Sequence, residues 1–188
     1  MEITSSAQAL ALFNKAKEML NDIQRWLENN AADIASKAKK IFTKDDFQFI
    51  DLGLPSGTLW AKDYAPGYYA FDEAQEAFPG LLPTAEMFQE LHDHCKWEWL
   101  SKSKSPGKKC AGYRVTGPNG KSIFFPALGY KLDDEIFIIG VSGYWWSACA
   151  SSSNGHFLFF YSGSVNPQSS NDDRYCGYSV RPALVAVP

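Results

Sequence analysis

Residues 111–125 read AGYRVTGPNGKSIFF. Two runs rich in aromatic and β-branched residues flank Gly117-Pro-Asn-Gly120, and Asn-Gly between such runs is the strongest short-range signal for a β-hairpin. The stretch therefore predicts two antiparallel strands, Ala111–Thr116 and Lys121–Phe125. A hairpin here argues against a parallel sheet, in which strands alternate with helices along the chain.

Short strands of the same kind are predicted on both sides of this hairpin. Gly143–Ala148 and His156–Tyr161 form a second candidate pair, with Asn154-Gly155 in the connection. Phe47 and Phe49 alternate with polar residues, as in a half-buried strand. The remaining predicted extended segments are Thr58–Ala61, Tyr68–Phe71 and a closing strand at Cys176–Arg181, with a long loop after Tyr161.

Two helices are predicted, one ahead of all these segments and one between Tyr68–Phe71 and the first hairpin. Residues 85–95 follow Thr84, a good N-cap, and Met87, Phe88 and Leu91 supply a buried stripe. Residues 7–42 contain no Gly or Pro and predict one long helix. The fold class is therefore α+β, with an N-terminal helical segment at 1–44 and a domain at 45–188.

The long helix carries a heptad seam. Apolar residues recur at spacings of three and four, and Asn30 interrupts them as the one polar member. This pattern is typical of coiled coils and predicts self-association, with a homotrimer as the expected form. The alternative is an amphipathic helix packed on its own domain, which Met19 and Trp26 favour because they widen the stripe. The seam residues are Phe13, Ala16, Leu20, Ile23, Leu27 and Ile34.

Charge and hydropathy argue against nucleic-acid binding and against membrane insertion. The net charge is -3, and no lysine follows Lys131, so a nucleic-acid partner is not expected. No run approaches the roughly 20 apolar residues that cross a bilayer, so membrane insertion is not expected. The N-terminus lacks the pattern of a secretory leader, which predicts synthesis in the cytoplasm.

Candidate catalytic and metal-binding residues are few. The four cysteines are widely spaced, without a CxxC pair, so we expect free thiols and no zinc site. His92 and His94 are two apart and would point in different directions on a helix. We therefore expect a non-catalytic protein with no cofactor and no bound metal.

Five sequence motifs follow one another along the chain. They are Asp51-Leu-Gly-Leu-Pro-Ser-Gly-Thr-Leu-Trp60, Leu82-Pro-Thr84, Gly112-Tyr-Arg-Val-Thr-Gly-Pro-Asn-Gly120, Gly143-Tyr-Trp-Trp-Ser147 and Gly177-Tyr-Ser-Val-Arg-Pro182. In these the chain resembles C-type-lectin-like domains, a fold group that includes formylglycine-generating enzymes. It is most similar to the variable proteins of diversity-generating retroelements. The resemblance covers about residues 47–183 and implies a C-type-lectin-like fold with short antiparallel strands and long loops.

The resemblance also implies how the C-terminal region varies. In such systems an error-prone copy replaces the 3′ end of the gene, and the altered codons cannot encode Lys, Glu, Gln, Met or Trp. Between Ser147 and Ser179, Gln168 is the one residue of those types. The signatures of calcium-dependent lectins are missing from the chain, and sugar binding without calcium stays open.

Alternation along His156–Tyr161 divides the predicted strand between two faces. Leu158 and Phe160 would join the core, while Phe157, Phe159 and Tyr161 would lie on an open face; the alternative is burial of all five. Arg181 is expected to be a buried hydrogen-bond hub. The expected ligand-binding residues are Cys149, Ser151, His156, Phe157, Phe159, Tyr161, Ser164, Ser169, Ser170, Asn171, Asp172, Asp173, Tyr175 and Cys176.

The expected function is receptor binding through a hypervariable C-terminal face. The receptor would be a protein or a glycan on a target cell, and the absence of a leader favours a phage tail tip, where the long helix mediates assembly. One alternative is a cell-surface adhesin of the same fold. Another, from a different class, is a degenerate enzyme of the formylglycine-generating type.

Overall fold

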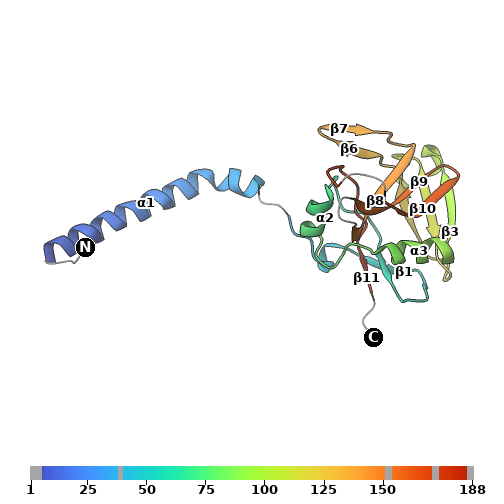
Figure 1. Cartoon of the computed structure of the whole chain (residues 1–188), viewed down its shortest axis with the longest axis horizontal. Helices are drawn as coiled ribbons and strands as arrows, with labels where there is room; N and C mark the ends of the chain where they lie inside the picture. The colour runs from blue at the N-terminus through green and yellow to red at the C-terminus, as the bar shows by residue number, and fades with distance from the viewer. Residues whose placement is uncertain (1–5, 38–39, 151–153, 171–173, 186–188) are drawn as a thin grey trace. The chain divides into compact units, whose positions relative to one another are not determined.

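The computed structural model describes residues 6–37, 40–150, 154–170 and 174–185 (Figure 1). The chain divides into two units, Met1–Lys40 and Ile41–Pro188. The boundary falls before the predicted residue 45, because Phe42 is buried in the second unit and its N–H donates to the Ala77 carbonyl at 2.7 Å.

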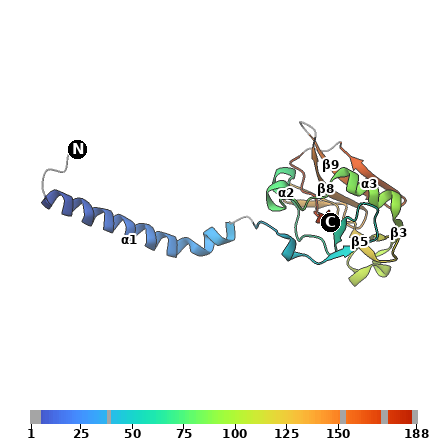
Figure 2. The ribbon, with the colours of Figure 1, turned by 90° about the horizontal axis from the view of Figure 1, so that it is seen from below.

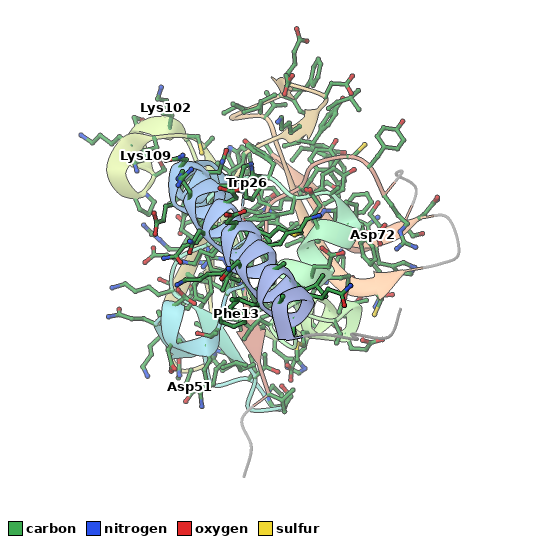
Figure 3. The ribbon with its side chains drawn as sticks, turned by 90° about the vertical axis from the view of Figure 1, so that its left-hand side faces the viewer. Phe13, Trp26, Asp51, Asp72, Lys102 and Lys109 are labelled. Carbon is green, nitrogen blue, oxygen red and sulfur yellow. The ribbon has the colours of Figure 1, made fainter. Side chains whose placement is uncertain are left out.

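Helix α1 spans Ser6–Lys37 and is the one described element of the first unit. The prediction of helix to residue 42 was wrong at this end, since residues 40–43 are not helical. Along α1, large apolar side chains are 48% to 66% exposed, among them Phe13 and Trp26, which Figure 3 labels. The full set is Leu10, Leu12, Phe13, Met19, Leu20, Ile23, Trp26 and Leu27.

Within the described residues, the second unit combines two α-helices and three short 3-10 helices with four small antiparallel sheets, which confirms the α+β class. The α-helices are α2 (Phe71–Ala77) and α3 (Ala85–His94), and the 3-10 helices are Lys44–Asp46, Lys102–Lys104 and Pro106–Lys108. One sheet has the order β1-β2-β11, from Phe49–Asp51, Leu59–Ala61 and Ala183–Leu184, and another joins β3, β4 and β5, from Lys96–Leu100, Gly112–Thr116 and Ser122–Pro126. A third has the order β10-β9-β8, from Ser164–Ser169, Gly155–Tyr161 and Ser142–Ala150, and β6 (Tyr130–Leu132) pairs with β7 (Glu135–Phe137).

Local sequence signals account for several of these elements. The predicted hairpin is β4 and β5, with Arg114 opposite Phe124 and Gly120 at φ 81° in its turn. The predicted pair at the C-terminal side is β8 and β9. Helix α3 begins as expected, since the Thr84 hydroxyl accepts a hydrogen bond from the Met87 N–H at 3.3 Å.

Three predicted segments differ in the structure. Tyr68–Phe71 is not a strand: Tyr69 makes an isolated bridge to Tyr178, and α2 begins at Phe71, where the Glu73 carboxylate accepts from the Ala70 N–H at 3.0 Å. The closing segment 177–179 makes isolated bridges, and β11 follows only after Pro182. The loop expected after Tyr161 contains strand β10.

Two buried clusters lie on opposite sides of the β8-β9-β10 sheet. Trp145, Leu158 and Phe160 belong to one cluster with Phe88 of α3. Trp146 and Phe157 belong to the other with Phe71 of α2. The two helices consequently cover opposite faces of this sheet, as Figure 2 shows.

Arg181 is the buried hub that the sequence predicts. Its side chain is 1% exposed, and Nη1 donates to the carbonyls of Ala61 at 2.6 Å and Lys62 at 2.9 Å. Nη2 donates to the Phe124 carbonyl. The guanidinium also lies 4.5 Å from the centre of the Phe125 ring. One side chain therefore ties the β2 end to β5.

Candidate functional site: an aromatic face on the C-terminal sheet

The β8-β9-β10 sheet has one face that stays partly open. Tyr144 of β8 lies opposite Phe159 of β9, and Phe159 also pairs with Asn166 of β10. Tyr161 pairs with Ser164 in the same way. Because alternate residues of a strand share a face, these side chains lie together on the side of Trp146 and Phe157, away from Leu158 and Phe160.

Five aromatic rings form a continuous row across this face. The ring centres of Phe137 and Tyr130 are 5.4 Å apart, those of Tyr130 and Tyr144 5.3 Å, those of Tyr144 and Phe159 4.9 Å, and those of Phe159 and Tyr161 5.9 Å. Four rings are half-buried and Tyr161 is 47% exposed. We call this row, with the neighbouring polar side chains Ser164, Asn166 and Ser169 of β10, the aromatic face.

The rings of the aromatic face rest on a buried layer. Tyr178 lies 5.0 Å from Tyr144 and 4.1 Å from Trp146, measured between ring centres. Phe157 packs against the same Tyr178 ring at 5.0 Å. Aromatic pairs at such separations stabilise by about 0.5–1.5 kcal/mol beyond their burial. The inner rings of the face are thereby held in place, while the Tyr161 end stays accessible.

The expectation that Phe157 lies on the open face was wrong. It shares the face of Phe159 and Tyr161 by alternation, but it is only 2% exposed. The physical reason is the segment at Gly177–Ser179, which brings Tyr178 over this end of the strand. At Phe157, the alternative of burial on both sides of the strand therefore holds.

His156, which was expected to bind ligand, lies on the face of the sheet opposite the aromatic face. Its position on β9 alternates with Phe157, so it shares the face of Leu158 and Phe160, which α3 covers. His156 is also close to Glu86 of α3. The pKa of the Glu86 carboxyl is lowered mainly by its hydrogen bond with Thr84 and to a smaller extent by His156.

The other predicted residues divide into three groups. Phe159, Tyr161, Ser164 and Ser169 are brought together on the aromatic face, as expected. Cys149, Ser170 and Cys176 are half-buried, and Tyr175 is 67% exposed beside a hollow of about 220 Å³ whose wall includes Lys131. Arg174 anchors the chain before Tyr175 by pairing with Asp72 of α2. Ser151, Asn171, Asp172 and Asp173 lie outside the described residues.

Sequence reasoning missed four members of the face: Tyr130, Phe137, Tyr144 and Asn166. Tyr144 was quoted only within the motif Gly143–Ser147. Its position opposite Phe159 depends on a register shift between Trp146 and Ala150, which a tight turn at Asn154-Gly155 does not predict. Asn166 was missed because the residues after Tyr161 were expected to form a loop, whereas they include β10. Pro167 within β10 is unusual, since a proline cannot donate a hydrogen bond to a neighbouring strand. Pro167 is tolerated because β10 is the edge strand of its sheet.

The described residues offer little for metal or thiolate chemistry. Among them, no group of three or more His, Cys, Asp and Glu side chains could hold a metal ion. Cys95, Cys110 and Cys149 are free thiols. Burial raises the pKa of Cys95 to about 11 and also raises that of Cys110, so both stay protonated at neutral pH, whereas a reactive cysteine needs a lowered pKa.

Comparison of the chain with protein-family models, with curated proteins and with solved structures found no match. Within the part of the chain that the structure describes, no helix is long and apolar enough to span a bilayer.

Proposed function

We propose that the protein is a receptor-binding protein and that the aromatic face contacts a protein or glycan on the surface of a target cell. One observation carries the proposal: five neighbouring rings, partly open to solvent, run from Phe137 to Tyr161 beside a row of small polar side chains. Tyr and Phe bring a large contact area at low entropic cost, and Ser and Asn bring adaptable hydrogen bonds. Binding would be non-catalytic and would need no cofactor.

The position of the aromatic face allows its residues to be substituted, so that variants of the protein can bind different ligands. Tyr161, Ser164 and Asn166 lie at its accessible end, on strands whose opposite face packs into the core through Phe160 and Val165. Substitutions at such exposed positions usually change stability by only about 0.5 kcal/mol. The face could therefore vary while the underlying layer holds its shape.

The resemblance to retroelement variable proteins supports a C-type-lectin-like assignment, which we also propose. The segment Ser147–Ser179, free of Lys, Glu, Met and Trp, contains all of β9 and β10. The motif Gly143–Ser147 lies in β8, and Gly177–Pro182 supplies both Tyr178, which packs against Tyr144 of the aromatic face, and the Arg181 hub. The segment with the composition expected of diversification thus supplies the accessible end of the face.

A matched pair of variants tests receptor binding. Ser164→Glu places a charge on the aromatic face, and Ser122→Glu makes the same change at an exposed position of β5. With the fluorescently labelled full chain on a panel of intact bacterial cells, we expect saturable binding to some strains. Ser164→Glu should weaken it at least about tenfold, since an unpaired charge in an interface costs more than 1.4 kcal/mol. Equal binding by both variants would place the receptor site elsewhere.

We further propose that α1 assembles the protein as a homotrimer, for display on a virion. Phe13, Leu20 and Leu27 occupy one heptad position, and Leu12, Met19 and Trp26 occupy the position before it. The apolar stripe is therefore wider than a simple two-helix seam. That width fits a trimer, in which each helix contacts two others, as well as it fits packing on the chain's own domain, and the stripe is exposed. The Asn30 side chain, which donates to the Trp26 carbonyl at 2.7 Å, is the polar break that fixes register in such helices.

Light scattering after size exclusion tests this assembly. We expect the full chain to have three times its chain mass of 21.0 kDa. The double variant Leu20→Glu, Leu27→Glu should be a monomer, because charges in the seam cannot be buried unpaired. The matched double variant Asn14→Glu, Asn21→Glu, at heptad positions outside the stripe, should stay trimeric. A monomeric wild-type protein would contradict the proposed trimer but would not bear on receptor binding by the aromatic face.

A further inference from the structure

A second hollow, unrelated to the aromatic face, lies beside the Arg181 hub. Its volume is about 440 Å³, within the range of small-molecule sites. Its walls come from chain segments that are far apart in the sequence, so the fold and not one loop creates it. The lining residues are Lys62, Asp63, Tyr64, Pro106, Gly107, Lys109, Cys110, Phe124, Pro126, Leu128, Ile139 and Arg181.

The charged residues of this hollow are mostly positive. Arg181 is 1% exposed, bonds to three backbone carbonyls, and leaves its buried Nε–H without a hydrogen-bond partner. Lys62 and Lys109 are exposed at the rim, and Lys109, which Figure 3 labels, belongs to the lysine-rich loop at residues 102–109. Among the described lining residues, Asp63 is the one carboxylate. Three cationic side chains against one anionic one favour an anionic ligand.

The guanidinium stays charged despite its burial. Burial lowers the pKa of Arg181 to about 9, and the neighbouring Asp63 carboxylate opposes this shift. At neutral pH the group is therefore a cation whose described hydrogen bonds go to carbonyls. Buried charges in proteins are ordinarily paired with an opposite charge, so the buried Arg181 guanidinium favours binding of an anion in the hollow.

The rest of the lining is apolar and selects for the body of the ligand. Phe124, Leu128 and Tyr64 offer aromatic and aliphatic surface, and Ile139 stands 54% exposed at the edge. Ile139 follows Ile138, which has φ 53°, a conformation that is rare for a β-branched residue. The Gly140 N–H holds this turn by donating to the Ala127 carbonyl at 2.7 Å. Such a lining suits an apolar group better than a phosphate, which needs several polar partners.

We propose that this hollow binds a small apolar carboxylate, with its carboxylate toward Arg181, Lys62 and Lys109 and its apolar body against Phe124 and Leu128. The site is independent of the receptor-binding face, and either one can exist without the other. Both Nη atoms of Arg181 already donate to backbone carbonyls, so the Nε–H, which has no described partner, is the donor that a carboxylate oxygen would accept from.

Titration of the full chain with three probes tests the proposal. Benzoate carries both required features, benzamide keeps the ring without the charge, and inorganic phosphate keeps a charge without the ring. By calorimetry and saturation-transfer NMR we expect benzoate to bind at least about tenfold more tightly than either other probe. Equal binding of benzamide, equal binding of phosphate, or no binding of benzoate would each overturn the proposal.

Rim variants locate the site without disturbing the buried hub. Lys109→Met should weaken benzoate binding about fivefold, whereas Lys104→Met, on the same loop but outside the hollow, should leave it unchanged. Ile139→Asp should abolish binding by placing a negative charge at the edge, and Ile136→Asp is its exposed control. Equal effects within each pair would also overturn the proposal.

Discussion

Replacing Arg181 with methionine is expected to lower the free energy of unfolding by about 3–5 kcal/mol. The carbonyls of Ala61, Lys62 and Phe124 lose their donors together, in a region where methionine can offer none. Burial of a charge costs free energy in itself, but removing the cation does not recover that cost while its partners stay buried and unsatisfied. Urea denaturation followed by tryptophan fluorescence measures the change.

Two comparison variants distinguish the hub from a general effect of losing arginine. Arg114 makes a half-exposed ion pair with Glu98 at 3.5 Å, so Arg114→Met should cost less than about 1 kcal/mol. Arg181→Lys keeps the charge but lacks the planar fork that reaches three carbonyls, and it should lose most of the same stability. If Arg181→Met were no worse than Arg114→Met, the hub would not hold the loops together.

The second large effect is a difference in stability between substitutions of Phe157 and Tyr161, two residues on the same face of β9. Phe157→Ala should lower the free energy of unfolding by about 3–5 kcal/mol, because it leaves a cavity beside Trp146 and Tyr178. Tyr161→Ala, four residues along the same strand and 47% exposed, should change stability by less than about 1 kcal/mol.

Receptor binding should show the reverse order for these two variants. Tyr161→Ala should weaken binding to cells, whereas folded Phe157→Ala protein should retain it at low temperature, because Phe157 does not reach the surface. Thermal denaturation measures the stability of the two variants, and the cell-binding assay measures their receptor binding. Equal losses of stability in the two variants would contradict the division of this face into a buried and an open end.

How far the sequence predicts the fold depends on the range of the interaction. The Asn119-Gly120 turn and the Thr84 cap act within a few residues, and both the β4-β5 hairpin and α3 are where they were expected. Strand β3 was missed, although Trp97 and Trp99 alternate with exposed Glu98, because a five-residue strand next to a helix gives a weak periodic signal.

The candidate site was predictable only in part for the same reason. Alternation placed Phe159 and Tyr161 together, but it cannot reveal that Tyr178, far along the chain, covers Phe157. The row also needs Tyr130 and Phe137, which reach the sheet through the separate β6-β7 hairpin. Those contacts are set by tertiary packing, and no local pattern in the sequence records them.

Sequencing the 3′ end of this gene and its flanks across many isolates tests the central claim most directly, which is that the aromatic face is a diversified binding surface. We expect substitutions concentrated in the codons for Tyr161, Ser164, Asn166 and Ser169, opposite adenines of a nearby template copy. The codons for buried Phe157, Leu158 and Phe160 should stay constant. Scattered substitutions with no template copy, or variation as frequent at the buried codons as at the exposed ones, would contradict it.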